Sequence, residues 1–96
     1  MNLVVASDKK TYLTDSVIGY LKKKDHKVTL LGDSVKKNGK WMEIGKEAAK
    51  KVTSGKVDQG VLFCWSGTGI CMAANKVKGI RAALCWDAET ARLARK

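Results

Sequence analysis

Two hydrophobic patterns alternate along the chain. Short continuous apolar runs are typical of strands buried on both faces, whereas apolar residues that recur every three or four positions indicate one face of a helix. The apolar runs predict strands over 2–6, 26–31, 58–64 and 80–85. The helical pattern covers 13–21, 41–54 and 68–77, and a last helix is expected from Ala88 onward.

The order β-α-β-α-β-α-β-α calls for an α/β fold in which helices cover both faces of a parallel sheet. A chain of 96 residues has room for one such domain, which we place over 1–96. In sheets of this kind, ligands bind beyond the carboxyl ends of the strands. The candidate positions are therefore Ser7 and Asp8, the segment from Cys64 to Gly69, and Trp86 with Asp87.

Local signals place the helix faces and ends. The faces expected to meet the sheet carry Leu13, Val17, Ile18 and Leu21 in the first helix and Ile44, Ala48 and Val52 in the second. Gly55 is placed to end the second helix, Gly79 to break the chain after the third, and Asp87 to cap the last. The polar segment 33–40 is expected to be a loop.

Composition excludes several classes of protein. The longest apolar stretch, 60–65, is far shorter than the roughly 18 residues that a membrane span needs. The first residues lack the basic segment and the long apolar core of a signal peptide. The three cysteines have no C-x-x-C spacing and the chain has one histidine, so we expect no metal site and a reduced, cytoplasmic protein.

The formal net charge of +10 leaves two interpretations open. Lysines at 22–24, 36–37 and 50–51 could form a surface for nucleic acid or phosphate, or they could be a solvated coat. No aromatic residues interleave with them, as a protein that stacks single-stranded bases would require. We therefore do not expect a nucleic-acid partner from the sequence.

The segment from Cys64 to Lys76 carries the candidate chemistry. A strand delivers a cysteine, a turn with Gly67 and Gly69 follows, and a helix begins. Glycines allow successive N–H groups to converge, and the positive end of the helix adds to their field, so the turn can hold a phosphate, a carboxylate or an enediolate oxygen. The same field favours a thiolate at Cys64, which could then act as a base or nucleophile.

Each of these residues also has a purely structural interpretation. Cys64 could be a small buried hydrophobe, which is what we expect of Cys71 and Cys85. A dinucleotide fingerprint is disfavoured because Met72 stands where a third glycine would be needed. Asp8 could cap the first helix as well as contact a ligand.

The remaining aromatic and imidazole side chains are expected outside the site. His26 stands where the first helix gives way to the second strand, so we expect it at the end of the sheet opposite the candidate site. Trp41, Trp65 and Trp86 are too scattered for a stacking platform, and we expect them to pack in the core or at its rim.

The motifs resemble those of the ribose-5-phosphate isomerase B / galactose-6-phosphate isomerase family. The resemblance rests on Cys64-Trp-Ser-Gly-Thr-Gly69, Met72-Ala-Ala-Asn-Lys76, Gly79-Ile-Arg-Ala-Ala-Leu-Cys85, Ala6-Ser-Asp8 and Leu13-Thr-Asp15. It covers essentially the whole chain. It implies a Rossmann-like three-layer sandwich, an aldose–ketose isomerase of phosphorylated sugars without metal or other cofactor, and a homodimer or dimer of dimers.

The resemblance also implies roles for individual residues. Cys64 matches the base that moves a proton between C2 and C1 through a cis-enediolate, and Ser66 a hydroxyl residue near the sugar oxygens. Backbone N–H groups would hold the enediolate oxygen, at Gly67, Thr68, Gly69, Ile70 and Cys71. Asp8 matches an acid that contacts the sugar.

The sequence departs from the family pattern at three places. Lys9 replaces a histidine that helps to bind phosphate, and Ile70 replaces the glutamate that serves as base in members without the cysteine. The chain ends at Lys96, before the strand, helix and phosphate-binding arginines with which the family continues. The alternatives to an active isomerase are therefore an inactive fragment of one, or a non-catalytic module that binds a phosphate ligand or nucleic acid.

Overall fold

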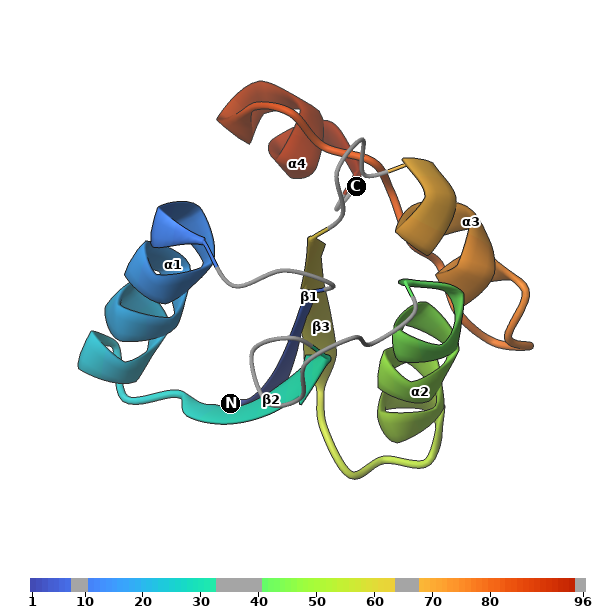
Figure 1. The fold of residues 1–96 in the computed structure, drawn as a ribbon, viewed down its shortest axis with the longest axis horizontal. Helices are drawn as coiled ribbons and strands as arrows, with labels where there is room; N and C mark the ends of the chain where they lie inside the picture. The colour runs from blue at the N-terminus through green and yellow to red at the C-terminus, as the bar shows by residue number, and fades with distance from the viewer. Residues whose placement is uncertain (8–10, 33–40, 64–67, 95–96) are drawn as a thin grey trace.

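A parallel sheet of three strands forms the centre of the fold (Figure 1). The computed structural model describes residues 1–7, 11–32, 41–63 and 68–94. The strands are β1 (Asn2–Ser7), β2 (Lys27–Gly32) and β3 (Gln59–Phe63), in the order β2-β1-β3. β1 is the central strand because its residues are apolar on both faces: Val4, Val5 and Ala6 are 0% exposed.

Helices cover both faces of this sheet, which confirms the predicted α/β class. They are α1 (Tyr12–Lys23), α2 (Trp41–Thr53), α3 (Thr68–Asn75) and α4 (Ala88–Ala94). Figure 1 shows α1 on one side of the sheet and α2 and α3 on the other. The predicted loop over 33–40 lies outside the described residues.

The core lies between the sheet and α2. The predicted inner face of α2 is confirmed, since Ile44 and Ala48 are buried and Val52 packs against them. The other residues of this core cluster are Val4, Ala6, Val57 and Ile70, with Leu31 and Leu62 packed against it. Gly55 follows α2 with a φ of +81°, as its predicted role as the end of the helix requires.

α1 is rotated from the predicted orientation. Leu13, expected to face inward, is 59% exposed, whereas Thr14 is 2% exposed. The half-buried Val17, Ile18 and Leu21 follow Thr14 at spacings of three, four and seven residues. The inner face of α1 therefore begins at Thr14 and not at Leu13.

Thr11, and not Asp8, caps α1. Thr11 Oγ1 accepts the N–H of Thr14 at 3.2 Å, and Thr14 Oγ1 accepts the N–H of Thr11 at 2.9 Å. The hydroxyl of the buried Thr14 also donates to the Thr11 carbonyl oxygen at 2.9 Å, so this reciprocal capping box satisfies its hydrogen-bonding capacity.

The predicted fourth strand over 80–85 is wrong: these residues have no regular secondary structure. A strand forms only where its backbone pairs with a neighbouring strand, and an apolar sequence does not by itself provide that neighbour. The Ala82 N–H and carbonyl oxygen both bond to the side-chain amide of Asn75 instead. Gly79, the predicted break before this segment, has a φ of +92°.

The helices within these ranges are too short and too polar to span a lipid bilayer.

Candidate active site

The carboxyl ends of the strands bring two candidate segments to one edge of the sheet. Ser7, the last residue of β1, is buried and pairs in register with Phe63, the last residue of β3. Asp8 follows Ser7 in the sequence and Cys64 follows Phe63, so the two segments leave the sheet from adjacent strands. Adjacent strands lie about 4.8 Å apart.

Five of the nine predicted site residues lie outside the described residues. These are Asp8, Lys9, Cys64, Ser66 and Gly67. The structure describes elements next to these residues in the sequence: the end of β1, the end of β3 and the start of α3.

The first turn of α3 supplies N–H groups close to this edge. α3 begins at Thr68, four residues after Cys64. The N–H groups of a first helical turn have no partner inside the helix, and they carry the positive end of its dipole. Gly69 and Ile70 belong to this turn, so their N–H groups are suited to hold a developing negative charge.

Packing holds this helix in place. Ile70 is 1% exposed, so its side chain is unavailable to a ligand. A Cβ built on Gly45 of α2 would lie 3.0 Å from Ile70 Cγ1 and 3.1 Å from the Ile70 carbonyl oxygen. The absence of a side chain at Gly45 is therefore what allows α2 to approach the first turn of α3 so closely.

The other two cysteines have different surroundings. Cys71 is half-buried, and its Sγ lies 3.5 Å from the Ala82 carbonyl oxygen, to which the thiol can donate. Its side chain is therefore turned toward 80–85, which leaves its N–H as the candidate contribution to the site. Cys85, predicted to be buried, is exposed because the segment that carries it is not part of the sheet.

Trp86 and Asp87 follow this segment. Trp86 is 78% exposed, so the expectation that it packs in the core or at its rim is wrong, for the same reason as for Cys85. Asp87 caps α4 as predicted: its Oδ1 accepts the Thr90 N–H at 2.7 Å. This backbone hydrogen bond, with a further bond from the Thr90 side chain, lowers the pKa of the Asp87 carboxyl below its usual value.

His26 lies at the opposite end of the sheet, as predicted. Its Nδ1 is 3.1 Å from the amino group of Met1, which precedes β1. No group of three or more potential metal ligands occurs among the residues that the structure describes.

Sequence reasoning missed the part that Asn75 plays beside this site. Asn75 ends α3 and holds Ala82 by two hydrogen bonds, which fixes the segment leading to Trp86 and Asp87. The available signal was an amide side chain at the last position of a helix, followed by an apolar segment.

Comparison with known proteins identifies relatives along the whole chain. The model of a family described as Ribose/Galactose Isomerase matches residues 3–96. The galactose-6-phosphate isomerase subunit LacB of Clostridium acetobutylicum is 49% identical over 77 residues, which is 80% of this chain and 44% of LacB. A probable ribose-5-phosphate isomerase B of Mycoplasma genitalium is 39% identical over 98 residues, covering 99% of this chain and 64% of that protein.

Solved structures of similar proteins point to the same family. The ribose-5-phosphate isomerase B of Clostridium thermocellum aligns with a TM-score of 0.90 and 36% identity, over 99% of this chain and 65% of that one. The chain thus spans less than two thirds of each of these three proteins.

Proposed function

Because the chain belongs to the ribose/galactose isomerase family, we propose that it is an aldose–ketose isomerase of phosphorylated sugars that converts ribose 5-phosphate into ribulose 5-phosphate. The observation that carries the proposal is the junction between β3 and α3. Cys64 follows a strand that pairs with the central strand, and the first turn of α3 begins four residues later. A base and a group of N–H donors are therefore close in sequence at the edge where such sheets bind ligands.

The reaction moves one proton from C2 to C1 and one from the C2 hydroxyl to the C1 oxygen. The Cys64 thiolate removes the proton from C2 of the open-chain aldose, and the electron pair of that C–H bond forms the C1–C2 double bond of a cis-enediolate. The negative charge then develops on the former carbonyl oxygen, where N–H groups from Gly67 to Cys71 stabilise it. The proton taken up by Cys64 returns to C1, and the C2 hydroxyl proton passes to the C1 oxygen, which leaves the carbonyl at C2. Substrate and product are therefore isomers, and no electrons are exchanged with a cofactor.

The other proposed residues bind and orient the sugar. Asp8 follows β1 in the sequence as Cys64 follows β3, and Asp8 is proposed to contact a sugar hydroxyl. Lys9 supplies a positive charge for the phosphate, and Ser66 a hydroxyl near the sugar oxygens. We propose that the active form is a homodimer or a dimer of dimers, which the family resemblance supports and sedimentation velocity would measure.

Deuterium exchange tests the proposal directly. Ribose 5-phosphate is incubated with the 96-residue chain in D₂O and followed by proton NMR. We expect loss of the C2 proton signal together with the appearance of ribulose 5-phosphate. In Cys64→Ala both rates should fall by about 10²–10⁴-fold, the usual contribution of a general base.

Cys85→Ala is the matched control, because it removes an exposed thiol that the proposed chemistry does not use. It should exchange at the rate of the unaltered chain. Exchange that survives in Cys64→Ala would contradict the role of Cys64, and absence of exchange in the unaltered chain would favour an inactive fragment or a non-catalytic ligand-binding module.

Galactose 6-phosphate is a second candidate substrate. The observation that favours it is the 49% identity to the LacB subunit over 80% of this chain. The same experiment with galactose 6-phosphate separates the two. Faster exchange with galactose 6-phosphate, again lost in Cys64→Ala, would identify galactose 6-phosphate as the substrate in place of ribose 5-phosphate. The reaction type would be unchanged.

A further inference from the structure

The fold collects lysines at the end of the molecule opposite the candidate active site. In a parallel α/β fold the helices run against the strands, so the ends of the helices meet the beginnings of the strands at one edge. The lysines at or next to this edge, here called the basic end, are Lys22, Lys23, Lys24, Lys27, Lys50, Lys51, Lys56, Lys76 and Lys78. The acidic residues there are Asp25 and Asp58.

These lysines are free to meet a partner. All are exposed except Lys51, which is half-buried. The ion pair found within the described residues joins Arg92 to Glu89 in α4, away from the basic end. Asp58 accepts the N–H of Asn2 at 2.8 Å, so one of the two local carboxylates already has a structural contact.

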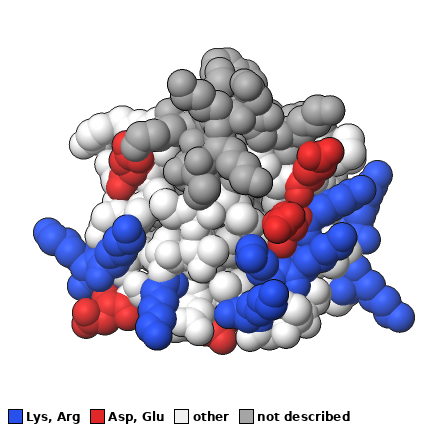
Figure 2. Space-filling model, turned by 60° about the horizontal axis from the view of Figure 1, so that its bottom comes forward, with Lys and Arg blue, Asp and Glu red and all other residues white. Residues whose placement is uncertain are grey.

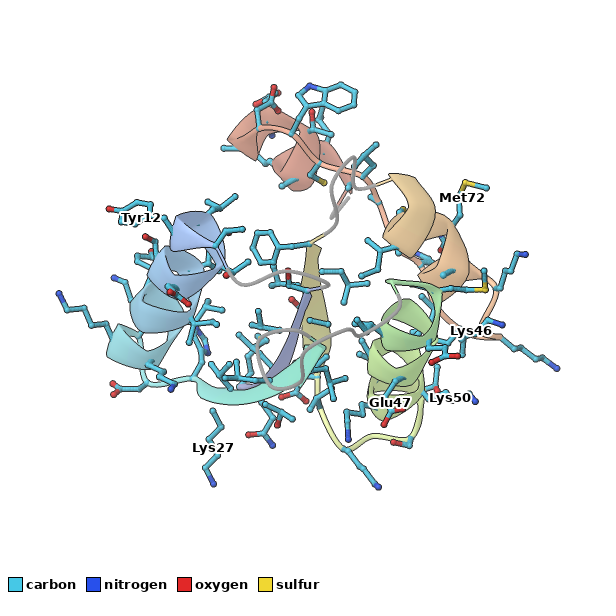
Figure 3. All side chains as sticks on the ribbon, viewed as in Figure 1. Tyr12, Lys27, Lys46, Glu47, Lys50 and Met72 are labelled. Atoms are coloured by element: carbon cyan, nitrogen blue, oxygen red, sulfur yellow. The ribbon has the colours of Figure 1, made fainter. Side chains whose placement is uncertain are left out.

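The figures show how this charge is distributed. In Figure 2 Lys and Arg side chains stand out on both flanks and across the lower half of the molecule, with Asp and Glu side chains beside them on each flank and at the bottom. Figure 3 shows Lys27 pointing down and away from β2 and Lys50 pointing away from the outer face of α2. The basic end therefore presents positive charge from several elements at once.

Helix stability explains part of this pattern. Lysines in the last turn of a helix interact favourably with its dipole, which accounts for Lys22 and Lys23 in α1 and for Lys50 and Lys51 in α2. The effect falls off within one turn, so it does not account for Lys27 at the start of β2 or Lys56 in the turn before β3.

We propose that the basic end binds a nucleic-acid duplex through its phosphate backbone, without preference for sequence. A duplex carries one negative charge per roughly 1.7 Å of its axis, so a surface about as wide as this molecule meets many phosphates. The exposed lysines of the basic end match such a backbone, which is contacted by point charges and needs no stacking aromatic side chains.

An anionic membrane fits the surface less well. Proteins that lie on membranes combine basic side chains with an apolar face that enters the lipid. The exposed large apolar side chains that the described sequence places near this end are Met1 and Tyr20. The Tyr20 ring already makes a cation–π contact with Lys24, whose Nζ lies 5.7 Å from the ring centroid.

The basic end acts independently of the sugar-phosphate site and does not rest on the proposed isomerase activity. The described chain is at least 26 Å across in every direction. Exposed charges at opposite ends are separated by more than two Debye lengths, which are about 8 Å each at 0.15 M salt. A sugar phosphate at the carboxyl edge of the sheet therefore leaves the basic end available.

The test measures binding of the 96-residue chain to fluorescent 20-base-pair DNA and RNA duplexes between 50 and 200 mM salt. If about four phosphates are contacted, the slope of log K against log salt is about −3.6, and affinity falls by roughly 100-fold over this range. The double variant Lys27→Gln/Lys56→Gln should reduce the slope by about 1.8 and weaken binding at 50 mM salt at least about tenfold.

The matched control, Lys46→Gln/Arg92→Gln, removes the same charge elsewhere and should change affinity less than about threefold. Circular dichroism checks that both variants keep the helix content of the unaltered chain. Ribose 5-phosphate at 10 mM should not displace the duplex. Equal losses in the two double variants, displacement by the sugar phosphate, or tighter binding to vesicles containing phosphatidylserine would each overturn the proposal.

Discussion

The side-chain amide of Asn75 pairs with both backbone groups of Ala82. Nδ2 donates to the Ala82 carbonyl oxygen at 2.9 Å, and the Ala82 N–H donates to Oδ1 at 2.8 Å. The amide thus takes the place that a neighbouring strand would have in a sheet, and Cys71 Sγ adds a weaker contact with the same carbonyl oxygen. The end of α3 is joined in this way to the segment that leads to α4.

Asn75→Asp should loosen this junction, because a carboxylate oxygen would face the Ala82 carbonyl oxygen and the donor would be lost. We expect the free energy of unfolding to fall by about 1–2 kcal/mol in urea titrations. Hydrogen exchange at the Ala82 amide should become faster. Lys76→Ala, at the neighbouring exposed position, is the control, and an unchanged Ala82 exchange rate in Asn75→Asp would contradict the role of the pair.

Gly45→Ala should disturb the packing of α3 against α2. The added methyl group would lie 3.0 Å from Ile70 Cγ1 and 3.2 Å from Ala73 Cβ, closer than carbon atoms normally approach. We expect the free energy of unfolding to decrease by about 1–3 kcal/mol, since overpacking outweighs the better helix propensity of alanine.

Gly19→Ala is the matched control within α1. A Cβ on Gly19 has nothing within 4 Å, so the same substitution should stabilise the protein by about 0.5–1 kcal/mol. Opposite signs for the two substitutions are the expected result of thermal or urea unfolding. Stabilisation by both would show that α2 and α3 can separate without cost.

Thr14→Val tests the capping box of α1. Valine keeps the shape of threonine but removes the hydroxyl that bonds both backbone groups of Thr11. We expect a loss of about 1 kcal/mol in the free energy of unfolding, typical of a lost helix cap. Ser16→Ala, on the exposed side of the same helix, should change it by less than about 0.5 kcal/mol, and equal effects of the two would argue against the box.

Acid should fray α4 through Asp87. The pKa of this carboxyl is lowered by the hydrogen bonds from Thr90, so its contribution to stability is present above the unfolded value of about 3.9 and is lost as the pH falls through the lower folded value. The Thr90 amide signal in NMR spectra should therefore titrate below about pH 3.9. In Asp87→Asn, which keeps an acceptor without a charge, that titration should disappear.

The features predicted correctly are those that depend on interactions between residues close together in the sequence. The apolar run of β1, the α2 face with Ile44 and Ala48, and the Asp87 cap each depend on periodicity or on a contact across three residues. Such interactions are available to the chain before it folds. The motif around Cys64 is of the same kind, which is why the family could be recognised from the sequence.

Tertiary structure decided the features that depend on distant partners. The run over 80–85 has the composition of a strand, but Asn75 holds its backbone and no pairing forms. Cys85 and Trp86 are consequently exposed, and the orientation of α1 leaves Leu13 in solvent while Thr14 is buried.

The positions of the lysines show most clearly what the sequence determines and what the tertiary structure determines. In the sequence they are scattered, and composition reveals only the net charge of +10. The parallel topology places the ends of the helices beside the beginnings of the strands, and it brings Lys27 and Lys56 to the same end of the molecule. Charge is thus a property of the sequence, whereas its concentration at one end follows from the direction in which strands and helices pack.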